Sequence, residues 1–146
     1  MGYEEIINML LNVFTRNGNV LLNVGPDPEG MIPPLHVQRL RQVGDWMKTH
    51  AESIYGTRGG PFQPTEYYGS TYKGKKIYIH IRNWPEECLI KLSAIKQKVK
   101  SYSLLTGGKV SVKQNKEAIS INVPLADRKP LDTVVVLMLN KPVTSI

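Results

Sequence analysis

Residues 19–30 read Asn-Val-Leu-Leu-Asn-Val-Gly-Pro-Asp-Pro-Glu-Gly, and the interpretation of the whole chain starts from this stretch. Its first half, residues 19–24, is mainly apolar, is too short for an independent helix and has turn residues on both sides, which predicts a strand buried on both faces. Its second half cannot continue a sheet, because two prolines remove hydrogen-bond donors and two glycines permit backbone angles that other residues avoid. The sequence therefore predicts a loop at the carboxyl end of a buried strand, which is where α/β folds and β/α barrels place ligand sites.

Helical patterns lie on both sides of this stretch. Apolar residues recur at helical spacing from Tyr3 to Phe14, and Asn17-Gly18 supplies the cap that ends the pattern. Pro33 and Pro34 suit the first turn of a second helix, where a missing amide hydrogen matters little, and the apolar stripe of this helix continues to residues 51–54. Glycine and proline punctuate residues 56–74, which are predicted as a connector.

The apolar period changes to two from Lys75 onward, as expected for strands with one face buried and one face solvated. Strand-like runs cover residues 77–82, 88–92, 99–105, 109–113, 118–123 and 133–139. The last run is almost entirely apolar and is predicted as a central strand. Short strands with close turns and no intervening helices predict a small antiparallel sandwich or barrel, so the fold class is α+β.

Charge is distributed unequally between the two halves of the 146-residue chain, whose net charge is +7. Residues 1–72 hold 5 Lys/Arg and 7 Asp/Glu, whereas residues 73–146 hold 14 and 5. Most of the lysines in the second half lie in turns or alternate with apolar residues, which is typical of solvated sheet faces and guarded edge strands. A nucleic-acid or other polyanion surface is the alternative interpretation. The single cysteine, Cys88, excludes an internal disulfide and is predicted to be buried.

Several groups of residues are candidates for catalytic or binding chemistry. Asp27 and Glu29 form a carboxylate pair of the kind that glycoside hydrolysis needs, but Asp-Pro-x-Gly is also ordinary turn chemistry, and this second interpretation is favoured. His50, Glu52 and Ser53 lie on diverging faces of a helix end, which disfavours a nucleophilic triad. His80 is interpreted as a residue of a sheet face. The aromatic residues near the turns are interpreted as lids of the core rather than as a sugar-stacking platform; they are Tyr67, Tyr68, Tyr72 and Trp84.

A resemblance to a known family adds what these patterns cannot. The segments Asn17-Gly18-Asn19-Val20-Leu21-Leu22-Asn23-Val24-Gly25-Pro26, Val43-Gly44-Asp45-Trp46-Met47 and Ile54-Tyr55-Gly56-Thr57 resemble the end of the catalytic barrel in family 29 α-L-fucosidases. Residues 71–80 and Trp84-Pro85 resemble the opening of that family's carboxyl-terminal domain. The resemblance implies a helix-strand-helix remnant of a (β/α)8 barrel in residues 1–58, a connector in residues 59–74 and a small antiparallel β-sandwich in residues 75–146.

The same resemblance implies a function for the parent enzyme. Family members hydrolyse terminal α-L-fucosides with retention, using two carboxylates and no metal or cofactor. No position of this chain matches the nucleophilic aspartate or the acid/base glutamate, which are expected upstream of Met1. The chain alone is therefore predicted to be an inactive, structural or accessory piece, from an enzyme that is periplasmic, secreted or lysosomal by resemblance.

Site and partner expectations follow from the place of the loop at the barrel rim. Asn23, Gly25, Pro26 and Asp27 are expected next to the substrate, a fucosylated glycan, and no nucleic-acid or membrane partner is expected. A barrel remnant is expected to expose apolar residues such as Ile7, Leu11, Val20 and Leu22, so the isolated chain is expected to pack its helices on its own sandwich or to self-associate. Two alternatives remain open: a free-standing carbohydrate-binding sandwich module, and a basic nucleic-acid module.

Overall fold

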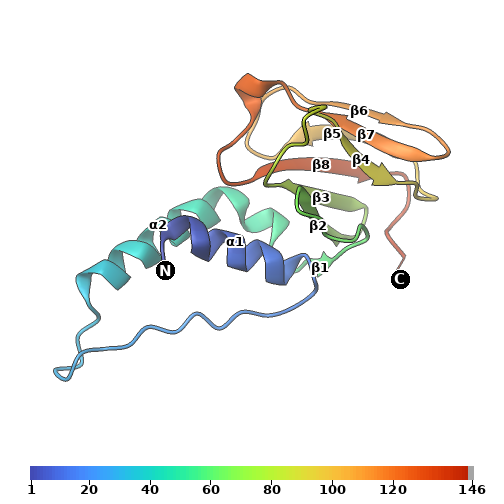
Figure 1. Cartoon of the computed structure of the whole chain (residues 1–146). Helices are drawn as coiled ribbons and strands as arrows, with labels where there is room; N and C mark the ends of the chain where they lie inside the picture. Colours follow the sequence, from blue (N-terminus) through green and yellow to red (C-terminus); the bar gives the residue numbers. More distant parts are fainter. Residues whose placement is uncertain (145–146) are drawn as a thin grey trace.

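The computed structural model describes residues 1–144 as two helices followed by two antiparallel sheets (Figure 1). The helices are α1 (Tyr3–Phe14) and α2 (Pro34–His50), and α2 runs into the short 3-10 turn η1 (Ala51–Ser53). The strands are β1 (Arg58–Gly59), β2 (Tyr68–Lys73), β3 (Lys76–Ile81), β4 (Ile90–Ser93), β5 (Val99–Leu104), β6 (Ser111–Gln114), β7 (Ala118–Asn122) and β8 (Thr133–Leu139). A second 3-10 turn, η2 (Leu125–Asp127), precedes β8.

The five-stranded sheet has the order β1-β2-β3-β8-β5, and the three-stranded sheet has the order β4-β7-β6. Their facing sides enclose the main core, because side chains alternate across each strand. From the larger sheet the core takes Ile77, Ile79, Ile81, Leu104, Val135, Leu137 and Leu139, and from the smaller sheet it takes Ile90, Leu92, Ile119 and Ile121. The predicted α+β class with an antiparallel sandwich is confirmed, and β8 has the predicted bounds and an interior place between β3 and β5.

The helices cover the other face of the five-stranded sheet, as Figure 1 shows for α1, α2 and the strands β2 and β3. A second apolar cluster lies between the helices and is formed by Ile6, Ile7, Leu10, Leu11, Trp46 and Ile54. The predicted helices are confirmed to within a few residues, including proline in the first turn of α2, but the residue of positive φ after α1 is Asn17 and not the expected Gly18. Because the helices lie on the sheet, Tyr78 and His80 are buried rather than solvated, which corrects the expectation for β3.

The predicted buried strand over residues 19–24 is not formed, and this prediction was wrong for the chain by itself. Residues 18–27 have no regular structure, and the side chain of Leu21 is 95% exposed. A strand needs neighbouring strands to pair its backbone groups, and no described strand lies beside this segment. Figure 1 shows residues 18–33 as a long projecting loop between α1 and α2.

Two further expectations are corrected. Strands β1 and β2 lie largely within residues 59–74, which were predicted as connector; β2 was missed because Gly69, Ser70 and Thr71 do not form an apolar pattern. Cys88 is exposed and has a φ of 54°, because it belongs to the turn before β4 rather than to the strand. Among residues 1–144, neither helix has the length and apolar character needed to cross a membrane.

Candidate functional site

The loop residues expected near the substrate all lie on the projecting segment between α1 and α2. Asn23, Gly25, Pro26 and Asp27 are exposed, and a Cβ atom added at Gly25 would meet no atom within 4 Å. Asp27 Oδ1 accepts hydrogen bonds from the backbone N–H groups of Glu29 (3.1 Å) and Met31 (2.7 Å). Asp27 therefore organises the turn, as the favoured interpretation of this sequence predicts.

Asn23 is the one of these four residues that borders a hollow. The hollow encloses about 200 Å³ and lies between the loop and the first turns of both helices. Its apolar lining is Met1, Ile6, Leu22, Val24 and Leu40, and its polar lining is Asn23, His36 and Arg39. Gly25, Pro26 and Asp27 lie outside it, so the structure of this chain does not bring the four predicted residues together around one cavity.

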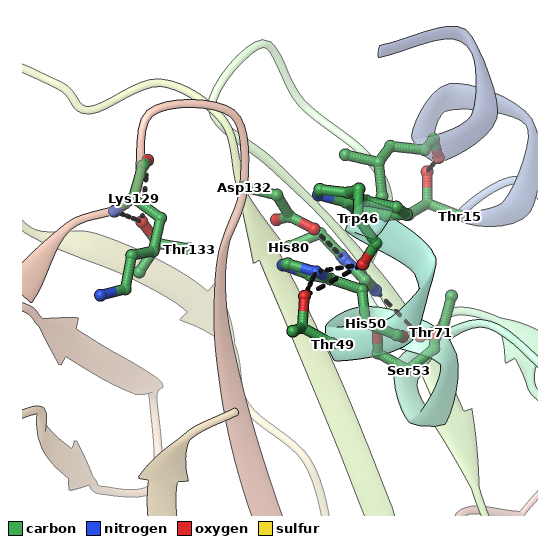
Figure 2. Close-up of polar contacts among 11 residues, drawn as sticks. Thr15, Trp46, Thr49, His50, Ser53, Thr71, His80, Lys129, Asp132 and Thr133 are labelled. Atoms are coloured by element: carbon green, nitrogen blue, oxygen red, sulfur yellow. Dashed lines mark hydrogen bonds and ion pairs between the residues drawn. The ribbon is translucent and has the colours of Figure 1, made fainter. Parts of the chain in front are cut away.

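A buried polar network lies instead where the helices meet the sheet (Figure 2). Thr71 on β2 places Oγ1 2.6 Å from the Ser53 carbonyl oxygen and 3.2 Å from His80 Nε2. His80 on β3 places Nδ1 2.7 Å from Asp132 Oδ2, just before β8. The side chains of His80 and Asp132 are both fully buried.

The donor and acceptor atoms set the direction of the two hydrogen bonds at Thr71. A carbonyl oxygen can only accept, so the Thr71 hydroxyl donates to Ser53 and its oxygen accepts from His80 Nε2–H. A further hydrogen bond joins His80 Nδ1 to Asp132 Oδ2. The order hydroxyl, imidazole, carboxylate matches that of a hydrolytic triad, but the hydroxyl proton is already donated to a carbonyl and all the groups are buried. The network therefore ties η1 to β2, β3 and β8.

His50, Glu52 and Ser53 diverge, as expected for residues at the end of a helix. Ser53 Oγ donates to the His50 carbonyl (2.7 Å), and the His50 ring stacks on Trp46 with centroids 4.2 Å apart. Glu52 points to the sheet, where its Oε1 accepts from Lys76 Nζ (2.6 Å) and from Tyr78 Oη (2.8 Å). These contacts confirm that the three residues form no nucleophilic triad.

The contacts of Glu52 shift two pKa values in opposite directions. The hydrogen bond from Lys76, followed by that from Tyr78, lowers the pKa of Glu52, because both stabilise the carboxylate. Burial, followed by the hydrogen bond to Glu52, raises the pKa of Tyr78 well above its usual range. Folding thus favours an ionised Glu52 and a neutral Tyr78.

A second group of hydrogen bonds links α1 to the end of β3. Arg82 Nη1 donates to Asn12 Oδ1 (2.6 Å), and Arg16 Nη1 donates to the same oxygen (3.1 Å). Burial, followed by the charge of Arg16, lowers the pKa of Arg82, while Asp132 offsets part of this effect. The two guanidinium groups line a cleft of about 660 Å³ that also contains Glu4 and Glu66.

The aromatic residues of the connector and turns close the sandwich core. Tyr67, Tyr68, Tyr72 and Trp84 pack against the core between the sheets, and the Arg128 guanidinium lies 4.0 Å from the centre of the Trp84 ring. This confirms their interpretation as lids. Within residues 1–144, no three His, Cys, Asp or Glu side chains are grouped so that they could hold a metal ion.

Comparison with known proteins finds α-L-fucosidases that resemble this chain. The family model for α-L-fucosidase matches residues 1–52. Plasma α-L-fucosidase of Rattus norvegicus is 36% identical over 87 residues, which are 56% of this chain and 19% of that protein; human tissue α-L-fucosidase is 34% identical over 94 residues, which are 62% of this chain and 20% of that protein. Isoenzyme 1 of α-L-fucosidase from Paenibacillus thiaminolyticus superposes with a TM-score of 0.84 at 31% identity, over 97% of this chain and 35% of that chain. The chain is similar to one part of the α-L-fucosidases.

The match covers only part of each relative. The chain spans about a fifth of the length of these curated relatives and about a third of the solved structures it resembles. The α-fucosidase of Thermotoga maritima gives the same proportion, with a TM-score of 0.75 at 27% identity over 94% of this chain and 34% of that chain. The match to solved fucosidases therefore covers both the helices and the sandwich.

Sequence reasoning missed the network of Thr71, His80 and Asp132. The sequence feature that could have indicated this network is the alternation in β3, which puts His80 on the face opposite to Ile79 and Ile81. The register pairs His80 with Val134, so Asp132 lies within reach only once β3 and β8 are paired. Neither the pairing nor the helical cover can be recognised from a single strand.

Proposed function

We propose that this chain is the carboxyl-terminal part of a retaining α-L-fucosidase that hydrolyses terminal α-L-fucosides of glycans, and that it contributes structure rather than the catalytic carboxylates. The observation that carries this proposal is the superposition of nearly the whole chain on about a third of a fucosidase. The other two thirds of such an enzyme lie outside the match and would hold the catalytic pair.

The uses of the described carboxylates support this assignment. A retaining glycosidase needs two carboxyl groups about 5–5.5 Å apart, one as nucleophile and one as acid and base. In this chain Asp27 organises a turn, Glu52 binds Lys76 and Tyr78, and Asp132 binds His80 in the interior. Each of these carboxylates already has a structural partner.

The structural role would be to fix the last helices of a barrel against the sandwich. The contacts that cross between the two layers include those of Thr71 with Ser53, Lys76 with Glu52, and Arg82 with Asn12. In the parent enzyme the projecting loop would then find strand partners, and Asn23, Gly25, Pro26 and Asp27 would lie at the catalytic rim.

A chimera tests the proposal directly. The matching third of the Paenibacillus thiaminolyticus enzyme is replaced by this chain, and hydrolysis of 4-nitrophenyl α-L-fucoside is compared with that of the chain alone and of the enzyme lacking that third. We expect activity with retention of the anomeric configuration, observed by NMR, from the chimera only. Hydrolysis by the chain alone, or a folded and soluble chimera without activity, would contradict the proposal.

The rim position of Asn23 is tested in the same chimera. Asn23→Ala should lower kcat/KM by about tenfold, as expected for the loss of a substrate contact of about 1.4 kcal/mol. Asn8→Ala, on the exposed face of α1, is the matched control and should leave kcat/KM unchanged. Equal kinetics for both variants would remove Asn23 from the substrate site.

A further inference from the structure

The open edge of the sandwich, between β5 and β6, has a groove that the proposed function does not use. Strand β5 ends the five-stranded sheet and β6 ends the three-stranded sheet, so the two lie next to each other without forming a ladder (Figure 1). The carboxamide of Gln114 bridges them: its Oε1 accepts from Val99 N (2.9 Å) and its Nε2 donates to the Gln97 carbonyl (2.8 Å). The groove therefore has a fixed frame.

The floor of this groove is apolar and its side carries an aromatic ring. The groove encloses about 530 Å³, and Ile95, Val99 and Val112 are partly buried in its lining. Tyr102 pairs in register with Leu137, whose side chain is in the core, so Tyr102 lies on the inward side of the edge strand. It is nevertheless 45% exposed, because no strand of the other sheet covers it completely.

The rim of the groove is positively charged. Lys96, Lys98 and Lys116 line it, and no Asp or Glu is among the lining residues, although Glu117 follows Lys116 in the chain. None of the ion pairs formed by residues 1–144 includes these three lysines. Among the described residues, the groove is thus lined by three lysines and by no carboxylate residue.

Protection of the sheet edges explains only part of this arrangement. Lysines on edge strands prevent pairing with another chain, and β5 and β6 are both edges. Edge protection does not account for a half-exposed aromatic ring in the same groove, because such a ring favours association. A ring face beside several cations is instead suited to a flat, partly apolar ligand that carries negative charge.

We propose that the groove between β5 and β6 binds an acidic oligosaccharide, with a sugar ring on Tyr102 and its sulfate or carboxylate groups beside Lys96, Lys98 and Lys116. The choice of a sugar rests on the proposed function, whereas the requirement for negative charge rests on the lysines alone. A single-stranded nucleic acid is the less favoured ligand, since its binding sites use several successive aromatic rings and arginines, and this groove has one ring and no arginine.

Titration calorimetry on the full chain tests this site. The probes are size-matched oligomers of dextran sulfate, polygalacturonate and neutral dextran, together with a single-stranded oligodeoxynucleotide. We expect binding of one or both acidic glycans, weakening with added salt, and at least about tenfold weaker binding of neutral dextran and of the oligodeoxynucleotide. The comparison of dextran sulfate with polygalacturonate shows whether sulfate or carboxylate is preferred.

Matched variants separate the groove from the general positive charge. Lys96→Gln, Lys98→Gln and Lys116→Gln together should weaken binding by about tenfold or more and reduce its salt dependence. The control is Lys75→Gln, Lys91→Gln and Lys109→Gln together, which removes the same charge from exposed positions elsewhere and should change binding less than about twofold. Tyr102→Leu keeps apolar cover over the core but removes the ring face, and should also weaken binding by about tenfold, whereas Tyr102→Phe should bind nearly as the unchanged chain.

Three results would overturn the proposal. They are the lack of binding to both acidic glycans, equal loss of binding in the two triple-lysine variants, and equal affinity for the oligodeoxynucleotide with no effect of Tyr102→Leu. The outcome is independent of the chimera. Glycan binding with an inactive chimera would refute the proposed function alone, and an active chimera whose chain does not bind glycans would refute the groove alone.

Discussion

Among single residues, Asp132 and His80 form the contact for which we expect the largest energetic effect. Asp132→Ala would leave His80 without its partner in a fully buried place, and removing one member of a buried pair typically costs about 3–5 kcal/mol. Asp45→Ala is the control, because the Asp45–Lys48 pair is exposed and should contribute less than about 1 kcal/mol. Urea unfolding at neutral pH measures both. Similar losses for the two variants would show that the buried network does not join the helices to the sheet.

A prediction on pH dependence follows from Tyr78 and Glu52. The pKa of Tyr78 is raised in the folded chain, so its contribution is complete below the unfolded tyrosine value of about 10 and is lost as pH rises through the folded value. The pKa of Glu52 is lowered, so its contribution is present above the unfolded glutamate value of about 4.3 and is lost as pH falls through the folded value.

Tyr78→Phe should therefore remove part of the decline in unfolding free energy above about pH 10, and Glu52→Gln should remove part of the decline below about pH 4.3. Tyr55→Phe, at an exposed ring, is the control for the alkaline limb. Urea unfolding at a series of pH values gives these curves. An alkaline limb of unchanged slope in Tyr78→Phe would mean that the phenol titrates alike in the folded and unfolded chain.

At the scale of elements, the close approach of α1 to β2 depends on a glycine. A Cβ atom at Gly69 would lie 2.6 Å from Thr15 Cγ2 and 2.7 Å from Thr15 Oγ1, and Thr15 Oγ1 is bonded to the Leu11 carbonyl. Gly69→Ala should therefore destabilise the chain by about 1–3 kcal/mol, as overpacking does. Gly44→Ala is the opposite case, because its site in α2 is open, and it should stabilise by about 0.5–1 kcal/mol. Thermal unfolding of the two variants should shift in opposite directions, and a shift in the same direction would contradict this packing.

The helices and strands also differ in how well the sequence predicts them. Elements that satisfy their own backbone, such as α1 and α2, or that have a strong apolar pattern, such as β8, were predicted with bounds close to those observed. The segment 19–24 has an equally strong pattern but no partner strand in this chain, so its pattern describes a contact that the chain alone cannot make. Strand β2 was not predicted because its sequence lacks an apolar alternation. Gly69 and Thr71 instead contact the helix layer, at Thr15 and Ser53, and strand periodicity does not indicate such contacts. The candidate site shared this limit, because His80 and Asp132 meet only through tertiary pairing.

At the scale of the whole molecule, the helix layer and the sandwich pack together, whereas the projecting loop has no partner strand within the described residues. The sandwich and the helix layer share buried polar contacts, so the helices do pack on the chain's own sandwich as expected. The expectation that Ile7, Leu11, Val20 and Leu22 would be exposed is corrected: Ile7 and Leu11 are fully buried, and Val20 and Leu22 pack against the helix cluster. The exposed apolar residues of the projecting loop and the start of α2 are instead Leu21, Met31, Ile32, Leu35 and Leu40. The apolar surface is therefore concentrated on the segment that would be covered in the proposed parent enzyme.

This concentration predicts self-association of the isolated chain through residues 18–40. Exposed apolar patches on a folded chain promote association, and Leu21 and Met31 are 95% and 65% exposed. Sedimentation velocity should show a concentration-dependent dimer, and Leu21→Lys with Met31→Lys should shift it toward monomer. Leu125→Lys is the control, because Leu125 is 79% exposed but lies in η2 on the sandwich, away from this segment. A monomer at all concentrations, or an equal shift with Leu125→Lys, would show that association does not depend on the segment left without partner strands.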